Sequence, residues 1–172
     1  MLEAVALAAT LAWPAAAAGM LPVPVSPPLA EFRVRIPRRA LAAAVHDALE
    51  GASQRMHRDG CSGIFGDFTD KDGRTLLSNL EAFSTDGPAY LGLIDFRDGL
   101  GIGRCERAGI MAVTAPGSRV VWVCGGFALA QKRDPGLAEV VVLHEALHTL
   151  GLREDPPSSL EITARVVKRC GR

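Results

Sequence analysis

A helical repeat of apolar residues begins shortly after Pro37. The positions that share this repeat are Leu41, Val45, Leu49 and Met56. Residues three or four positions apart lie on one face of an α-helix, so the pattern predicts an amphipathic helix. His46 and Glu50 lie four positions apart on its polar face, and we interpret them as an exposed pair rather than as metal ligands.

Shorter apolar runs separated by turn residues follow. We expect a short helix from Thr75 to Phe83 and a strand within Ala89–Phe96. Ile110–Thr114 and Val120–Val123 are rich in β-branched residues, and proline and glycine lie between them, which predicts a hairpin or two adjacent strands. Because helices and strands occur in separate runs, the predicted fold class is α+β. We expect a small domain with a few-stranded sheet, a buried helix and a C-terminal helix.

The most apolar helical pattern lies between Asp134 and Gly151. Asp134 can cap the free backbone amides of a helix, and Pro135 suits its first position. Gly151 is placed to end the helix. The run Val140–Leu143 covers every side of one helical turn. We therefore expect this helix to be buried in the middle of the domain.

Charge and composition exclude several classes of partner. The chain has 172 residues, with 19 basic and 19 acidic side chains, and 48% of its residues are hydrophobic. A nucleic-acid binder needs a basic excess to contact phosphates, and so does a protein held on anionic membranes. We therefore expect no nucleic-acid partner and no stable membrane span, and we expect a monomer with one hydrophobic core.

The N-terminal segment has the pattern of an export signal. Met1–Trp13 is almost continuously apolar and is followed by a proline and a run of alanines. This order is typical of a secretory signal peptide, which we assign to residues 1–18; an uncleaved anchor is the alternative. The prolines of residues 19–36 predict an extended linker, which leaves residues 37–172 for the domain. We therefore expect a protein that is secreted or located in the periplasm or cell envelope.

The four cysteines support an oxidising location. They are Cys61, Cys105, Cys124 and Cys170. An even number of cysteines in an exported chain predicts two disulfides, for which three pairings exist. Because no two of them form a Cys-x-x-Cys pair, a cysteine-ligated zinc site is not expected.

The buried helix carries the sequence His144-Glu145-Ala146-Leu147-His148. His144 and His148 are four positions apart, so their imidazoles lie on one face and can bind one ion. Glu145 lies beside that face and can accept a proton from a metal-activated water molecule as the water attacks a carbonyl. The motif therefore predicts one Zn²⁺ ion per chain, with Glu145 as the catalytic residue.

This motif resembles that of the zincin metallopeptidases, and the resemblance covers residues 120–170. The stretch from His144 to Leu152 is similar to the metzincin signature, in which the third ligand follows the glycine by three residues; that position here is Glu154. No methionine follows, so the Met-turn of that clan is absent. In the gluzincin branch the third ligand is a glutamate on the next helix, which Glu161 matches.

The third ligand therefore has several candidates. We favour Glu161, with Glu154 as the main alternative and Asp155 as a further one. Ser158-x-x-Glu161 is also a capping box, in which Glu161 would only satisfy backbone amides at the start of a helix.

The resemblance implies zinc-dependent hydrolysis of peptide bonds in a peptide or protein substrate. It also implies that the strand Val120–Val123 lines the cleft and pairs with the substrate backbone. Tyr90 and Arg153 are weak candidates for stabilising the oxyanion. For the disulfides, we hypothesise Cys124–Cys170 and Cys61–Cys105.

Two other functions stay open. The first is a zinc-binding module of zincin fold that recognises a partner without turnover. The second is a structural envelope protein without a metal.

Overall fold

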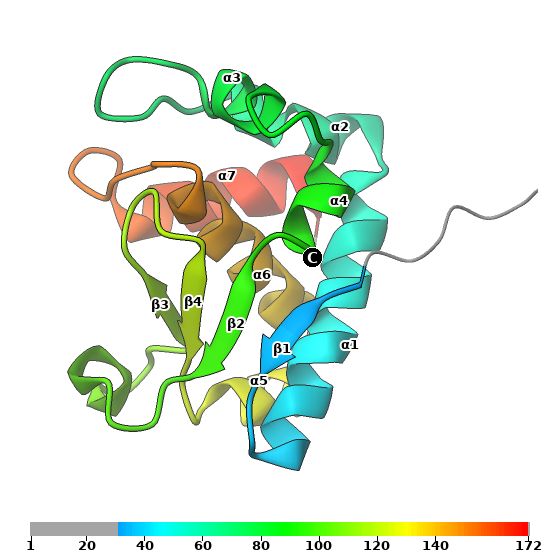
Figure 1. The fold of residues 1–172 in the computed structure, drawn as a ribbon, viewed down its shortest axis with the longest axis vertical. Helices are drawn as coiled ribbons and strands as arrows, with labels where there is room; N and C mark the ends of the chain where they lie inside the picture. The colour runs from blue at the N-terminus through cyan, green and yellow to red at the C-terminus, as the bar shows by residue number, and fades with distance from the viewer. Residues whose placement is uncertain (1–30, 172) are drawn as a thin grey trace, which may run out of the picture.

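One mixed sheet lies in front of helices α1 (Arg39–Met56) and α6 (Pro135–Thr149) (Figure 1). The computed structural model describes residues 31–171. The four strands lie in the order β1-β2-β4-β3. Their bounds are β1 Arg33–Arg35, β2 Asp95–Asp98, β3 Ala112–Thr114 and β4 Val120–Val123. The first three strands in this order are parallel, whereas β3 runs antiparallel to β4 and forms one edge. The α+β class and the predicted hairpin are therefore confirmed.

The long helix α1 packs against α5 (Phe127–Arg133) and α6, and α6 crosses behind the sheet (Figure 1). The apolar repeat predicted for α1 is buried, and it meets the inward side chains Phe96 and Val121 of the sheet and Leu143 of α6 in one core. The short helix predicted at Thr75–Phe83 is confirmed as α3 (Leu76–Glu81), with Thr75 as its cap. Helix α5 was not predicted, and neither were three shorter helical segments: α2 Asp59–Ser62, η1 Gly63–Gly66 and η2 Gly103–Glu106.

The prediction of a strand within Ala89–Phe96 is wrong for the first half of this range. Residues Gly87–Leu91 form helix α4, and the strand begins only at Asp95. Asp86 Oδ1 accepts a hydrogen bond from Ala89 N at 2.8 Å, and Pro88 lies in the first turn. A capping side chain followed by proline is a strong helix start, and here it outweighs the β-propensity of the following residues.

The boundary predicted between linker and domain also needs correction. Residues 33–35 form β1, which pairs with Asp95–Arg97, so the domain begins before residue 37. Val34 alternates with two arginines and packs against the core, which is the pattern of a short edge strand. The predicted signal peptide at residues 1–18 and the linker up to residue 30 lie outside the described residues.

Helix α6 begins and ends as the sequence predicted. Asp134 Oδ1 accepts from Leu137 N at 3.0 Å at its start. At its end, Gly151 has a φ of 110°, Gly151 N donates to His148 O and Leu152 N donates to Leu147 O. These two bonds form a Schellman motif, which reverses the chain immediately after the helix.

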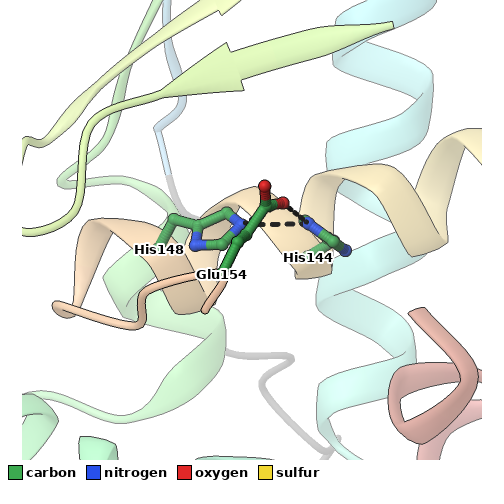
Figure 2. Close-up of side chains that lie close together, drawn as sticks. All are labelled: His144, His148 and Glu154. Carbon is green, nitrogen blue, oxygen red and sulfur yellow. Dashed lines mark hydrogen bonds and ion pairs between the residues drawn. The ribbon is translucent and has the colours of Figure 1, made fainter. Parts of the chain in front are cut away.

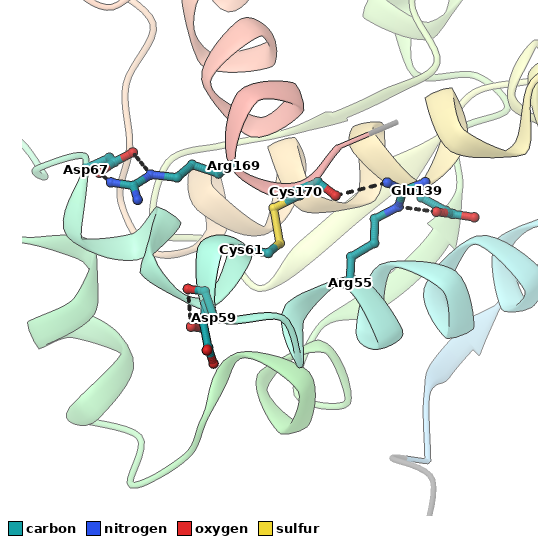
Figure 3. Close-up of a disulfide and its surroundings, with 8 residues drawn as sticks. Arg55, Asp59, Cys61, Asp67, Glu139, Arg169 and Cys170 are labelled. Carbon is teal, nitrogen blue, oxygen red and sulfur yellow. Dashed lines mark hydrogen bonds and ion pairs between the residues drawn. A yellow bond between two sulfur atoms is a disulfide. The ribbon is translucent and has the colours of Figure 1, made fainter.

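Helix α7 (Ser159–Cys170) lies along α6 and is bound to the rest of the domain at its C-terminal end (Figure 3). The disulfide Cys61–Cys170 joins it to α2. Arg169 donates to Asp67 at 2.8 and 2.5 Å. Arg55 donates to Cys170 O at 3.1 Å and forms an ion pair with Glu139 of α6.

The disulfide pairing hypothesised from the sequence is wrong. The bonds are Cys61–Cys170 and Cys105–Cys124, with Cα–Cα distances of 4.4 and 5.0 Å. Helix α7 ends beside α2, and η2 lies against the end of β4, so each cysteine meets its spatial neighbour rather than the partner suggested by sequence order. All four cysteines are thus paired, as expected of an oxidised protein. None of the helices in residues 31–171 combines the length and apolar character needed to cross a bilayer.

Candidate metal centre

Three side chains converge at the C-terminal half of α6 (Figure 2). His144 Nε2 and His148 Nε2 lie 3.0 Å apart, because the two residues are one helical turn apart on the same face. Glu154 Oε1 lies 3.5 Å from His144 Nε2 and 3.3 Å from His148 Nε2. The two imidazoles are almost fully buried, whereas the carboxylate of Glu154 is half exposed.

The turn at Gly151 brings Glu154 to this position. Because the Schellman motif folds the chain back over the last turn of α6, the buried Leu152 lies beside Leu147. The following residues then pass over the histidine face. A carboxylate three residues after the glycine therefore reaches both imidazoles.

Glu161, the ligand favoured from the sequence, is not at this site. Its Oε2 accepts from Ser158 N and from Ser158 Oγ, at 2.8 Å in both cases, and the residue is exposed. The capping box therefore occupies Glu161, and the structure brings Glu154 to the histidines instead. Asp155 lies along a different hollow, outside the group. His46 and Glu50 are exposed on α1, as expected.

A second contact orients each imidazole. His148 Nδ1 lies 2.8 Å from Leu152 O, a carbonyl that can only accept, so Nδ1 carries the proton and Nε2 of the neutral ring has a free lone pair. His144 Nδ1 lies 3.0 Å from Thr163 Oγ1 on α7, which can accept in the same way. Partners of this kind select the tautomer that binds a metal through Nε2.

The three donor atoms lie close enough to one another to hold a cation between them. Two lone pairs and a carboxylate oxygen repel one another when they face each other at about 3 Å. Protonation does not supply a positive charge easily, because burial and the nearby His148 lower the pKa of His144 to about 4. Ligands at about 2.0–2.1 Å from a tetrahedral zinc ion lie roughly 3.3 Å apart. The observed distances of 3.0, 3.3 and 3.5 Å fit such an ion.

Glu145 lies next to the histidines and is almost fully buried. Among the described residues, its Oε2 has no hydrogen-bond partner. Burial, with a smaller contribution from Glu154, raises the pKa of Glu145 to about 8. A cation held by the cluster would act in the opposite direction and favour the carboxylate. The arrangement therefore provides a proton acceptor beside a group of metal ligands.

A cleft of about 460 Å³ opens beside the cluster. His144, Glu145, His148 and Glu154 line one part of it, and the edge strand β3 lines another. The turn after β3 is attached to α6, since Gly117 N donates to His148 O at 2.8 Å.

The strand next to the cleft differs from the one expected. Val120–Val123 forms β4, which lies between β2 and β3 and is paired on both sides. A strand paired on both sides cannot accept a further strand, so the edge of the sheet that lines the cleft belongs to β3.

The two weak oxyanion candidates also lie elsewhere. Tyr90 is fully buried, and its hydroxyl lies 2.9 Å from Thr149 Oγ1. Arg153 lines the hollow beside Asp155.

The sequence gives no sign of three residues that the structure places at the site. Thr163 contacts His144 only because α7 packs on α6. Arg104 and Arg107 line the cleft from the η2 segment. A threonine within a helix and arginines in a loop carry no local pattern that distinguishes them.

Comparison with family models, with curated proteins and with solved structures gives no match to this chain.

Proposed function

We propose that the chain is a secreted zinc metallopeptidase of zincin type. The observation that carries the proposal is the convergence of His144 Nε2, His148 Nε2 and a Glu154 oxygen beside the buried Glu145. Two histidines and one carboxylate leave a fourth position of a tetrahedral ion for water, which is the composition of a catalytic rather than a structural zinc site. Two disulfides are consistent with export.

The residues of the centre would have separate roles in metal binding, proton transfer and orientation of the ligands. His144, His148 and Glu154 would hold the zinc ion, which when bound supplies a Lewis acid that polarises a carbonyl and acidifies water. Glu145 Oε2 would accept the proton of the attacking water and transfer it to the leaving amine. Thr163 and Leu152 O orient the two imidazoles.

The free edge of β3 would bind the substrate backbone. Met111 O accepts from Cys124 N, so the backbone groups of Met111 point toward β4. Because these groups alternate along a strand, those of Ala112 and Thr114 face the opposite edge. An extended peptide can add there as a further strand and pass in front of the metal ligands.

The first experiment measures zinc in the disulfide-bonded chain by mass spectrometry. We expect about one zinc ion per chain, loss of binding in Glu154→Ala, and retention in Glu161→Ala as the matched control. His148→Ala should also lose it. A well-folded protein that takes up no zinc when it is supplied would refute the proposal.

The second experiment tests turnover. A library of quenched fluorescent peptides should be cleaved by the zinc-loaded protein and not by Glu145→Gln, which keeps the ligands. Cleavage that persists in Glu145→Gln at equal zinc content would rule out Glu145 as the base. Zinc binding without cleavage of any peptide would instead indicate a binding module.

A further inference from the structure

Two arginines line the same cleft as the metal ligands. Arg104 lies in η2 (Gly103–Glu106), and Arg107 follows directly after it. Both residues are exposed. Within residues 31–171, no carboxylate forms an ion pair with either guanidinium. Arg38, Arg55 and Arg169, by contrast, are each paired.

The segment that carries the arginines is held in place. Cys105, between them, is bonded to Cys124 at the end of β4. Ile110 N donates to Arg107 O at 3.4 Å, and the chain then enters β3. The two arginines therefore lie in a fixed segment that leads into the edge strand, rather than on a free loop.

The charge of the cleft lacks an anion to match these arginines. The acidic residues that line it are Glu145 and Glu154, and both belong to the metal centre. Two carboxylates balance the charge of one divalent cation, so no further carboxylate that lines the cleft is left to pair with the two guanidinium groups. A partly enclosed site of one sign attracts a ligand of the opposite sign.

We propose that Arg104 and Arg107 select substrates by binding a carboxylate of the peptide that lies along β3. This inference rests on the proposed peptidase function for the identity of the ligand. A strand rises about 3.3 Å per residue, so a peptide aligned with β3 would place this carboxylate a few residues from the bond that is cut. Guanidinium groups bind carboxylates with two parallel hydrogen bonds, which gives both charge and geometry.

The carboxylate has two possible sources. It is either an aspartate or glutamate side chain of the substrate or the carboxylate at the end of the peptide. The chemistry of recognition is the same for both. A peptide with an internal glutamate and an amidated C-terminus tests the first source, and a neutral peptide with a free C-terminus tests the second.

Binding measured on zinc-loaded Glu145→Gln separates recognition from turnover. The probes are fluorescent peptides of alanine, serine and leucine, in which one glutamate is moved along the sequence and is compared with glutamine at the same position. We expect the glutamate or free-acid peptide to bind about fivefold tighter than its neutral match, and added salt should weaken this preference.

Substitution of the arginines should remove the preference. Arg104→Gln/Arg107→Gln should bind both peptides of a pair equally, whereas Arg104→Lys/Arg107→Lys should keep part of the difference. Arg58→Gln is the matched control, because Arg58 is exposed and lies outside the cleft. Zinc content and circular dichroism establish that each variant is folded.

The outcomes distinguish this inference from the proposed function. Three results would overturn the inference. They are equal binding of both peptides in every matched pair, no binding of any peptide, and a preference for carboxylates that persists without the arginines. If wild-type protein cleaves no peptide but still prefers carboxylates, the peptidase proposal fails and carboxylate recognition stands.

Discussion

Thr163 Oγ1 lies 3.0 Å from His144 Nδ1, so a side chain of α7 holds a proposed metal ligand of α6. The contact joins the two helices at the point where the orientation of the imidazole matters most. We therefore expect Thr163→Val, which keeps the shape and removes the hydroxyl, to lower zinc affinity about tenfold or more. Competition with a chromophoric chelator measures this affinity.

A purely structural role for Thr163 would give a different result. Thr163→Ser keeps the hydroxyl and should retain most of the zinc affinity, although it removes a methyl group. Equal loss of affinity in the valine and serine variants would show that packing, rather than the hydrogen bond, is the contribution of Thr163.

Gly151 is expected to be sensitive to substitution, because its φ of 110° disfavours a side chain. A Cβ at this position would also lie 3.1 Å from the Cβ of Asp70. We expect Gly151→Ala to lower the free energy of unfolding by about 1–3 kcal/mol and to weaken zinc binding by displacing Glu154. Gly66→Ala is the control, since no atom lies within 4 Å of its Cβ position. Urea unfolding compares the two, and equal stabilities would contradict the expectation.

The two disulfides should differ in their contribution to stability. They separate their cysteines by 109 and 19 residues. In the chain-entropy account, removal of the longer link costs about 4.7 kcal/mol and removal of the shorter one about 3 kcal/mol. Urea unfolding of Cys61→Ser/Cys170→Ser and of Cys105→Ser/Cys124→Ser measures the difference. The first variant should also lose zinc affinity, since it releases α7; a larger effect of the second would argue against this.

Acid should destabilise the protein, in part through three aspartates. Hydrogen bonds from Arg169 to Asp67, from Asn79 to Asp70 and from Arg38 to Asp98 hold the pKa of each carboxyl below its usual range. A pKa that is lower in the folded state adds stability above the unfolded value of about 3.9, and this stability is lost as the pH falls through the folded pKa.

The pH dependence can be measured as the urea midpoint between neutral and acidic pH. Asp67→Asn should flatten the loss on acidification relative to wild type. Glu145 has a raised pKa, so its contribution to stability changes with pH in the opposite direction. Wild type and Asp67→Asn both contain Glu145, so its contribution cancels when the two proteins are compared. Parallel curves for wild type and Asp67→Asn would exclude a contribution from the Arg169 contact.

The sequence predicts those parts of the site that depend on local geometry. The spacing of His144 and His148 places them on one face of any helix, and the capping residue Asp134 and the ending residue Gly151 define that helix. The third ligand, a carboxylate, depended on two local features. The capping box keeps Glu161 at the start of its own helix, and the chain reversal at Gly151 places Glu154 beside the histidines.

The parts that sequence reasoning missed depend on packing between distant segments. The disulfide partners follow from where α7 ends and where η2 lies. The residues around the cysteines carry no sequence pattern that predicts either position. The same holds for Thr163, whose role arises only when α7 lies on α6. The free edge at β3 follows from strand order, which periodicity does not encode.

The Cys61–Cys170 bond has a consequence for a protein that would work among proteases. Hydrolysis of a single peptide bond anywhere in residues 62–169 leaves both pieces covalently joined. A nicked molecule would keep its mass, apart from one added water, until it is reduced. A cut made by a neighbouring copy would therefore not be seen on a non-reducing gel, and the two pieces would separate only after reduction.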